Sequence, residues 1–292
     1  MRTERANAKL NLLLSVGSKR PDGYHDLVSV MQTVSLCDLV TIDYRPGLST
    51  KITLDISGAV LPSDCRNLAY RAAEEFLKKA DRRGEVLLHL EKHIPMAAGL
   101  GGGSADAAAV LRGLNLLCGS PLSKAELCKL GATLGADVPF CVVGGSAVAQ
   151  GVGELLTTIP MMPQTSIVVA CGGEGVSTKE AYSAIDDLPP KSKKTPNPEA
   201  VKSAFLEGDL AGAFPLFFND FEAVVEDRRP LVGKIKEAMK ESGATFTMMS
   251  GSGPSVFGIF PDLRKAGECQ LALEKQGVSA FVCHPTKAYF NE

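Results

Sequence analysis

Near the start of the chain, hydrophobic and polar residues alternate. The aliphatic positions are Leu10, Leu12, Leu14 and Val16, and the polar positions between them include Lys9, Asn11 and Ser15. A period of two residues is typical of a strand with one buried face. We therefore predict a half-buried strand over residues 9–16, with Lys9 and Asn11 together on its polar face.

More short strands are predicted before residue 95. They are rich in aliphatic residues, are separated by Gly, Pro or Ser, and cover residues 27–34, 38–44, 50–57 and 85–94. One helix is predicted between them, over residues 67–80, because its apolar and charged residues fall on opposite sides at helical spacing. The first ninety residues or so should therefore form mainly sheet.

After Pro95 the pattern becomes helical. Apolar residues recur every three or four positions from Ala107 to Leu117, which predicts a helix that stops near Gly119. A second helix should begin at Ser123, because Ser123 and Glu126 have the spacing of a capping box. The loop that follows this helix, GADVPF, carries Asp137.

The second half alternates helices with strands. Strands are predicted over 165–171, 244–250, 255–260 and 278–284, and helices over 230–243 and 263–276. The Pro-rich connector IPMMPQT suggests a boundary that gives domains 1–160 and 161–292, and the polar, Pro-rich stretch 186–198 should be an exposed loop. We predict an α+β protein.

Composition narrows the class of protein. A chain of 292 residues with 45% hydrophobic and 22% charged residues is a folded protein of about two domains, and its net charge of -2 argues against general nucleic-acid binding. The sequence has neither an apolar run of the roughly 20 residues that cross a bilayer nor a signal-peptide cleavage pattern. Its eight cysteines lack C-x-x-C spacing, which argues against zinc or disulfide scaffolds. We expect a cytoplasmic protein without a membrane or obligate protein partner.

The segment PMAAGLGGGSADAAAV, residues 95–110, is the most informative. Its glycines lead directly into a helix, where converging backbone N–H groups and the helix dipole favour an anion such as phosphate. The alternative is a flexible turn capped by Ser104. The segment is neither a Walker A loop, because no lysine follows the required spacing, nor a dinucleotide fingerprint, because Asp106 stands where the third glycine would fall.

A second glycine-rich turn, SGSGPS at residues 250–255, lies between two predicted strands. It is either a simple connection between strands or a second site for anionic groups. With one such turn in each half, the sequence suggests that a nucleoside triphosphate and its acceptor bind between two domains.

Asp137 and Lys9 are candidates for chemistry. Asp137 is a carboxylate in an otherwise apolar segment, where it serves either as a turn cap or as a proton acceptor. Lys9 is either an ordinary solvent-facing strand lysine or a cation that keeps this carboxylate ionised and neutralises developing charge. Together they suggest a pair that activates a hydroxyl group.

Two aromatic pairs are candidates for binding a planar ring. Tyr24 and His25 follow a Pro-Asp-Gly turn, and they either pack over that turn or stack on and hydrogen-bond a base. Thr178 and Tyr182 lie four residues apart on one face of a presumed helix, with the same two alternatives.

These motifs, in this order, resemble the GHMP kinase superfamily, which is named for galactokinase, homoserine kinase, mevalonate kinase and phosphomevalonate kinase. The resemblance rests on AKLNLLLSVGSKRPDGYHDL, on PMAAGLGGGSADAAA with LGADVPF, and on MSGSGPSVFGIF, which cover nearly the whole chain. It implies a two-domain fold: an N-terminal α/β domain like that of ribosomal protein S5, a C-terminal ferredoxin-like α+β domain, and an active site in the cleft between them.

AKLNL, RPDGYH, GLGGGSADAA and LGADVP together resemble the branch of the superfamily whose acceptor is 4-diphosphocytidyl-2-C-methyl-D-erythritol. The resemblance implies that ATP phosphorylates the 2-hydroxyl of this alcohol in non-mevalonate isoprenoid biosynthesis. Asp137 would take the hydroxyl proton beside Lys9, and Asn11 would contact the acceptor. Tyr24 and Tyr182 would sandwich cytosine, His25 would read its hydrogen-bonding edge, and Thr178 would lie nearby.

The resemblance also implies the residues around ATP. They are Asn67, Lys92, Pro95, Met96, Ala97, Ala98, Gly99, Leu100, Gly101, Gly102, Gly103, Ser104, Ala105, Gly251 and Gly253. Mg²⁺ is expected to bridge the phosphates of ATP, with Ser104 as the best candidate for a protein ligand.

Two positions depart from the family pattern. Ala97 stands where Gly is more common, and Ala105 replaces a common second serine. We expect these two differences to affect the affinity for the nucleotide more than the type of reaction. Two alternatives stay open: another GHMP small-molecule kinase, of the homoserine or mevalonate type, or a nucleotide-binding module without catalysis.

Overall fold

The computed structural model describes the chain except for residues 22, 172, 174–177, 187–193 and 291–292. The larger of its two sheets has the strand order β3-β4-β2-β1-β8, with β5 paired to β2 and β6 paired to β5. These strands are β1 (Arg2–Lys19), β2 (His25–Pro46), β3 (Lys51–Ser57), β4 (Gly84–Glu91), β5 (Ser146–Gln150), β6 (Leu155–Ile159) and β8 (Phe218–Asn219). The segments 27–34 and 38–44, predicted as separate strands, are parts of the single long β2.

β1 is buried on both faces, so the prediction of a half-buried strand was wrong. Residues 6–16 are buried throughout. The helix α2 (Gly102–Leu117) packs against β1, while Leu10 and Leu12 pack in a cluster with Phe257 of the second sheet. The alternation in the sequence therefore separates two buried environments, one apolar and one polar. Lys9 and Asn11 do share a face, as predicted.

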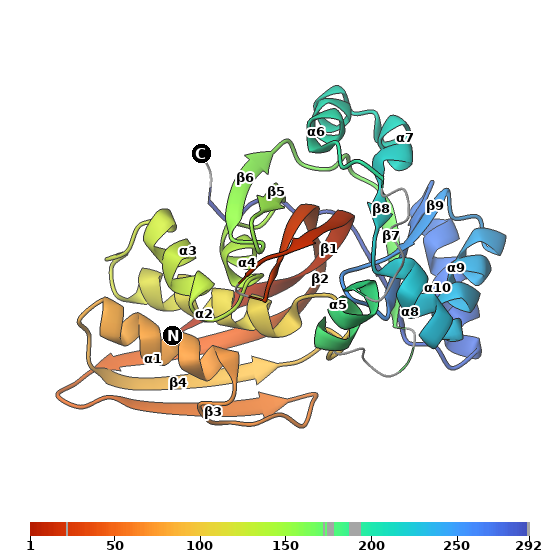
Figure 1. The fold of residues 1–292 in the computed structure, drawn as a ribbon. Coiled ribbons are helices and arrows are strands. Elements are labelled where there is room, and N and C mark those ends of the chain that lie inside the picture. The colour runs from red at the N-terminus through yellow and green to blue at the C-terminus, as the bar shows by residue number, and fades with distance from the viewer. Residues whose placement is uncertain (22, 172, 174–177, 187–193, 291–292) are drawn as a thin grey trace.

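The predicted helices of the first half are confirmed. They are α1 (Leu68–Lys79), α2 and α3 (Lys124–Ala132), and a short helix, α4 (Val138–Val143), follows Asp137 directly. The capping box at Ser123 and Glu126 is present at the start of α3. Figure 1 shows α1 beside strands β3 and β4, at the end of the molecule opposite to α9 and α10, while α2 packs against α1, β1 and β2.

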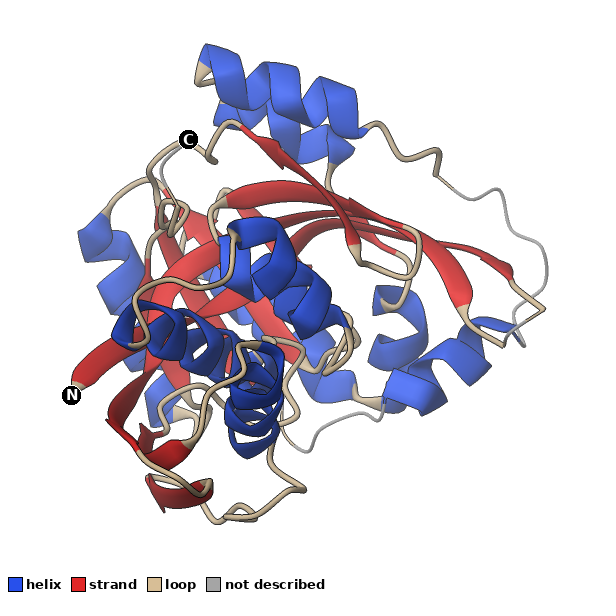
Figure 2. Cartoon of the chain, turned by 90° about the vertical axis from the view of Figure 1, so that its left-hand side faces the viewer, coloured by secondary structure: helices blue, strands red, loops and turns tan. Residues whose placement is uncertain are grey.

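The smaller sheet has the order β11-β7-β10-β9 and belongs to the second half. Its strands are β7 (Ser166–Cys171), β9 (Phe246–Met249), β10 (Ser255–Phe260) and β11 (Ala280–Cys283). The helices around it are α5 (Thr178–Asp186), α6 (Pro198–Glu207), α7 (Leu210–Ala213), α8 (Glu222–Arg228), α9 (Pro230–Glu241) and α10 (Leu263–Lys275), with a 3₁₀ turn, η1, at Phe214–Leu216. Figure 2 shows the long curved strands running through the molecule with helices on both sides.

The predicted boundary near residue 160 falls in the connection between β6 and β7, but the two halves are interlocked. β8 comes from the second half and pairs in parallel with β1. The C-terminal segment also returns to the larger sheet, where the Thr286 N–H donates to the Thr33 carbonyl oxygen at 2.9 Å. The predicted loop 186–198 lies mostly outside the described residues.

Within the described residues, every helix is too short or too polar to span a bilayer.

Candidate active site

A cleft of about 1100 Å³ opens where the two sheets approach each other. Among the residues that line it are many of those predicted from the sequence: Lys9, Asn11, Tyr24, His25, Asn67, Lys92, Pro95 to Ser104, Asp137, Tyr182 and Gly251. The fold therefore brings the middle of β1, the glycine-rich loop, the bend before α4 and the second glycine turn to one site.

Lys9 and Asp137 meet in this cleft. The Lys9 ammonium lies 3.6 Å from Asp137 Oδ2, and the lysine side chain is only 5% exposed while that of Asp137 is 38% exposed. The Lys9 Nζ also donates a hydrogen bond to Asn11 Oδ1 at 2.5 Å. The arrangement places a partly solvated carboxylate beside a buried ammonium, as a group that accepts a proton from a bound hydroxyl requires.

The orientation of Asn11 is fixed by its other contacts. Its Nδ2 donates to Ser29 Oγ at 2.8 Å, and that hydroxyl donates to the Leu13 carbonyl oxygen at 2.8 Å. Asn11 Oδ1 is therefore directed at Lys9, and the side chains of the β1 polar face are held in one geometry.

The glycine-rich loop ends where α2 begins. Gly101 is the N-cap of α2, with a φ of +70° that L residues other than glycine rarely adopt. A Cβ at Gly101 would lie 2.9 Å from Lys9 Cγ, so the loop lies directly against the candidate lysine. The first turn of this 16-residue helix lines the cleft at Gly102, Gly103 and Ser104, and the N–H groups of a helix start favour a phosphate.

The two glycine turns contact each other. A Cβ at Gly99 would lie 2.3 Å from the Ser250 carbonyl oxygen, and the Ser250 hydroxyl donates to the Gly99 carbonyl oxygen at 3.3 Å. Gly251 belongs to the same wall, because a Cβ there would lie 3.2 Å from Lys9 Nζ. The second turn is thus part of the site and more than a connection between strands.

Three residues predicted to surround ATP differ in their relation to the cleft. Ala97 lines it, is exposed and has a φ of +49°, a backbone conformation that favours glycine. Ala105 is 1% exposed and packs in the core under α2, and Gly253 lies against Met249 Sδ. Neither Ala105 nor Gly253 is among the described residues that line the cleft.

Lys92 lines the cleft, and two buried carboxylates balance its positive charge. Its ammonium donates to Asp106 Oδ2 at 2.7 Å and to Asp38 Oδ2, and both carboxylates are buried. Burial opposes the charge of Lys92, but Asp106 and Asp38 outweigh that effect and raise its pKa. Burial raises the pKa of Asp106 to about 7; Lys92 opposes this rise and Asp38 adds to it. Lys92 therefore lines the cleft and also joins Asp38 and Asp106 in one buried ion-pair cluster.

Asn67 lines the cleft at the start of α1. Its Oδ1 accepts the Ala69 N–H at 2.9 Å, and its Nδ2 donates to the Pro62 carbonyl oxygen at 3.0 Å. These bonds cap α1 and occupy both ends of the amide. They hold Asn67 in place at the rim.

The aromatic residues gather at the other end of the cleft. His25 is buried and stacks on Tyr182, with ring centroids 5.0 Å apart and planes at 21°. This spacing leaves no room for a third ring between them, so the expected sandwich by Tyr24 and Tyr182 is not formed on that face of Tyr182. Tyr24 is 65% exposed at the rim. The side chain of Thr178 lies outside the described residues, although its backbone begins α5.

Asp186 is a site residue that the sequence reasoning missed. His25 Nε2 lies 2.7 Å from Asp186 Oδ1, and Lys19 Nζ donates to Asp186 Oδ2 at 2.7 Å. The bonds from Lys19 and His25 lower the pKa of the Asp186 carboxyl. Its spacing of four residues from Tyr182 on α5 was the signal that could have found it, because such residues share a helix face.

Two family models match the chain. The model for the GHMP kinases N terminal domain covers residues 67–145, and the model for the GHMP kinases C terminal region covers residues 201–279. The region matched by the C-terminal model contains the second glycine turn, and the region matched by the N-terminal model contains the glycine-rich loop and Asp137.

Relatives and solved structures give the same result. A 4-diphosphocytidyl-2-C-methyl-D-erythritol kinase of Caldicellulosiruptor saccharolyticus is 43% identical over 88% of this chain and 87% of its own length. The enzyme of that name from Alkaliphilus metalliredigens is 38% identical over 98% of this chain and 96% of its own.

A crystal structure of 4-(cytidine 5'-diphospho)-2C-methyl-D-erythritol kinase matches with a TM-score of 0.80 and 35% identity, over 97% of this chain and 99% of that one. A homoserine kinase of Cytophaga hutchinsonii, at a TM-score of 0.71 and 17% identity over 99% of this chain and 96% of that one, shares the fold. The chain belongs to the GHMP kinases and, within them, to the 4-diphosphocytidyl-2-C-methyl-D-erythritol kinase family.

Proposed function

We propose that this chain transfers the γ-phosphoryl group of ATP to the 2-hydroxyl of 4-diphosphocytidyl-2-C-methyl-D-erythritol, a step of non-mevalonate isoprenoid biosynthesis. The observation that carries the proposal is the Lys9–Asp137 pair, 3.6 Å apart, against the glycine-rich loop at the start of α2. Family membership supports the same activity, because the relatives that cover most of the chain bear this name.

The reaction needs little covalent chemistry from the protein. Phosphoryl transfer is accelerated mainly by positioning and by stabilising charge on the transferred group. The Asp137 carboxylate accepts the proton of the 2-hydroxyl as its oxygen attacks the γ-phosphorus, and ADP leaves. The Lys9 ammonium, held by Asn11, stabilises the negative charge that develops on the attacking and phosphoryl oxygens. Backbone N–H groups of the loop hold the phosphates.

The donor set near the loop fits a Mg²⁺ ion that is bound mainly by ATP. Within the described residues, no cluster of three or more His, Cys, Asp or Glu side chains is placed to hold a metal. Mg²⁺ in kinases usually takes one or two protein ligands and several phosphate or water oxygens. The Ser104 hydroxyl, which lines the cleft in the first turn of α2, is the protein group best placed for it. When bound, the ion would neutralise charge on the phosphates.

The aromatic end of the cleft suits the cytidine group. We place the base beside the stacked His25 and Tyr182, with Tyr24 closing over it from the rim. Asp186 holds the His25 ring in position for hydrogen bonding to the edge of the base. The acceptor hydroxyl would then lie towards Asn11 and Asp137.

The test is turnover across acceptors. With ATP and Mg²⁺, we expect ADP release with the cytidyl alcohol and none above background with homoserine or mevalonate. Turnover of homoserine without turnover of the cytidyl alcohol would overturn the proposed acceptor. ATP binding without turnover of any of the three would favour a non-catalytic module.

A further inference from the structure

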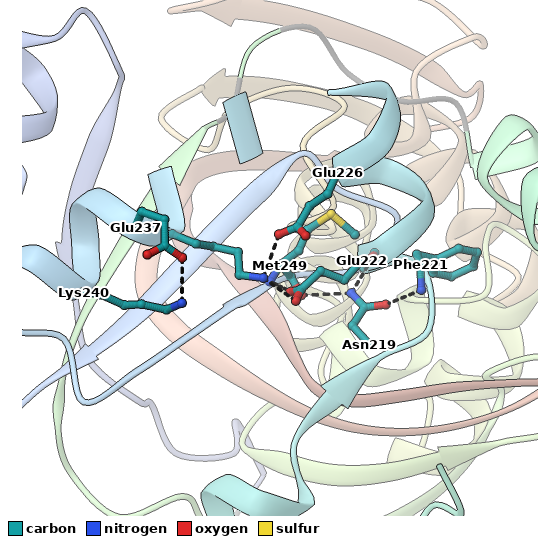
Figure 3. Close-up of polar contacts among 9 residues, drawn as sticks. Asn219, Phe221, Glu222, Glu226, Glu237, Lys240 and Met249 are labelled. Carbon is teal, nitrogen blue, oxygen red and sulfur yellow. Dashed lines mark hydrogen bonds and ion pairs between the residues drawn. The ribbon is translucent and has the colours of Figure 1, made fainter. Parts of the chain in front are cut away.

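The segment from Asn219, the last residue of β8, to Glu222, the first residue of α8, joins the larger sheet to α8, and its Phe221 lines the cleft. Each of its four residues contacts an element of the site or of its support. The Phe221 ring meets the edge of Tyr182, with centroids 4.9 Å apart and planes at 86°, and Asp220 Oδ2 accepts the Val16 N–H of β1 at 2.7 Å. Asn219 contacts Gly251 of the second glycine turn, and Asn219 and Glu222 both bond to Met249, the last residue of β9, which leads into that turn (Figure 3).

Asn219 holds the turn through its amide group. Its side chain is buried, and its Nδ2 donates to the Met249 carbonyl oxygen at 2.9 Å and to the Gly251 carbonyl oxygen at 2.8 Å. Its Oδ1 accepts the Phe221 N–H at 3.0 Å. Both donors and the acceptor of the amide are therefore used, and an aspartate at this position could make only the bond to Phe221.

Glu222, the first residue of α8, binds the end of β9 that leads into the turn. Its Oε2 accepts the Met249 N–H at 2.6 Å, and its Oε1 accepts a bond from Lys236 Nζ of α9 at 2.5 Å. Lys236 also donates to Glu226 Oε1 at 2.7 Å. The main chain at Met249 is thus bound on both its N–H and its carbonyl oxygen by two side chains that are three residues apart.

On its other side, the turn contacts the part of the cleft that contains Lys9 and Asn11. Gly251 lies against Lys9 Nζ, and the Ser250 hydroxyl oxygen accepts the Asn11 N–H at 3.2 Å. The Ser255 N–H donates to the Ala98 carbonyl oxygen at 3.3 Å, which joins the end of the turn to the glycine-rich loop. Any movement of the turn therefore changes the environment of Lys9 and of the loop together.

We propose that Asn219 is a positioning residue for phosphoryl transfer: its amide fixes the second glycine turn, residues 250–255, against the glycine-rich loop and so sets the position of the Lys9 ammonium. Asn219 acts through the turn and has no contact with the reacting atoms. The inference rests on the proposed function, because it assigns Lys9 a role in the transition state. A misplaced catalytic cation reduces turnover more than it reduces binding.

The test is Asn219→Asp, which keeps the size of the side chain and its acceptor but removes both donated bonds. We expect kcat to fall at least tenfold, with the KM values for ATP and for the acceptor changed less than about threefold. Asn219→Ser, whose hydroxyl can donate one bond, should give an intermediate kcat and provides the measurement if the aspartate variant does not fold.

Two control variants separate positioning from stability. Leu273→Ala removes a buried apolar side chain of α10, which packs in the same cluster as Met249 but donates no hydrogen bond to the turn, and should lower the urea midpoint with kcat unchanged well below that midpoint. Glu237→Ala breaks an exposed ion pair with Lys240 on α9, seen beside the network in Figure 3, and should change neither property.

A kcat within twofold of wild type in Asn219→Asp or Asn219→Ser would overturn the inference. So would an equal loss of kcat in Leu273→Ala, because that would make the effect one of stability alone. Each kcat is divided by the wild-type kcat for whichever acceptor the wild-type protein phosphorylates. If the wild-type protein does not phosphorylate the cytidyl alcohol, the proposed function is refuted, and the role of Asn219 is still tested with the acceptor that is phosphorylated.

Discussion

Replacing Asp137 with asparagine separates catalysis from binding and from folding. The carboxylate is 38% exposed and 3.6 Å from Lys9 Nζ, and among the described residues its side chain makes no capping hydrogen bond to α4. Because Asp137 is partly solvated, its ion pair with the buried Lys9 should contribute on the order of 1 kcal/mol to stability, less than the roughly 3–5 kcal/mol lost when a fully buried pair is broken. Lys9 keeps its bond to Asn11 at 2.5 Å in the variant, so the free energy of unfolding should fall by no more than about that amount.

The effect on turnover should be much larger. Removal of a group that accepts the hydroxyl proton reduces kcat by about 100-fold or more, and that factor corresponds to about 2.7 kcal/mol in the activation free energy. The dissociation constant for ATP should change less than about threefold, because the glycine-rich loop binds phosphate through its backbone. The three quantities come from coupled ADP release, isothermal titration with ATP, and urea unfolding.

The matched control is Asp55→Asn. Asp55 is an exposed carboxylate of β3 that pairs with His89 at 2.8 Å, and it is not among the described residues of the cleft. This variant should retain wild-type kcat. A kcat for Asp137→Asn within threefold of wild type would refute the assigned role, and a parallel loss of ATP binding would assign Asp137 to the nucleotide instead.

Three further changes test other parts of the site. Because Ala97 has a φ of +49° and is exposed, Ala97→Gly should be more stable to urea than Ala97→Val by at least about 1 kcal/mol, and equal midpoints would contradict the backbone explanation. Asp186→Asn weakens the hydrogen bond that orients His25. In steady-state kinetics, the KM for the cytidyl acceptor should therefore rise about tenfold while the KM for ATP stays constant. Equal rises in both KM values would argue against a role of Asp186 in binding the cytosine base. The pKa of Asp106 is raised by burial to about 7 in the folded protein, so the unfolded state, in which this carboxyl has its ordinary pKa of 3.8, releases its proton first. Wild type should therefore lose stability relative to Asp106→Asn as the pH rises from about 4 to 7, by at most about 1.4 kcal/mol per pH unit. Urea unfolding at pH 5 and pH 7 measures this difference, and identical pH dependence in the two proteins would exclude the buried carboxyl as its source.

Local features of the site could be predicted from the sequence because they depend on local rules. The alternation in β1 placed Lys9 and Asn11 on one face, and the glycines before α2 indicated a loop open to phosphate. The meeting of Lys9 with Asp137 could only be proposed, because it depends on how α4 packs near β1 across more than a hundred residues of chain. The burial of β1 on both faces escaped prediction for the same reason, since its second cover comes from the other half.

The supporting residues gave weaker signals. Asp38, Asp106 and Lys92 are single charged residues in different elements, and nothing in their spacing shows that they form one buried cluster. Asn219 looks like an ordinary loop residue in sequence, and its role follows from two main-chain carbonyl oxygens that only the folded turn presents to it. Polar groups that bind main-chain atoms leave no periodic pattern to read.

Because β8 pairs with β1, the first half of the chain needs a strand from the second half to complete its sheet. Phe218 and Asn219 complete the edge of a sheet whose other strands are made from the first 160 residues, and the C-terminal tail returns to that sheet at Thr33. A fragment ending near residue 160 would expose the hydrogen-bonding edge of its own central β-hairpin, and such edges promote aggregation. We therefore expect the two pieces to be poorly soluble when produced separately and to reconstitute a working enzyme when produced together in one cell.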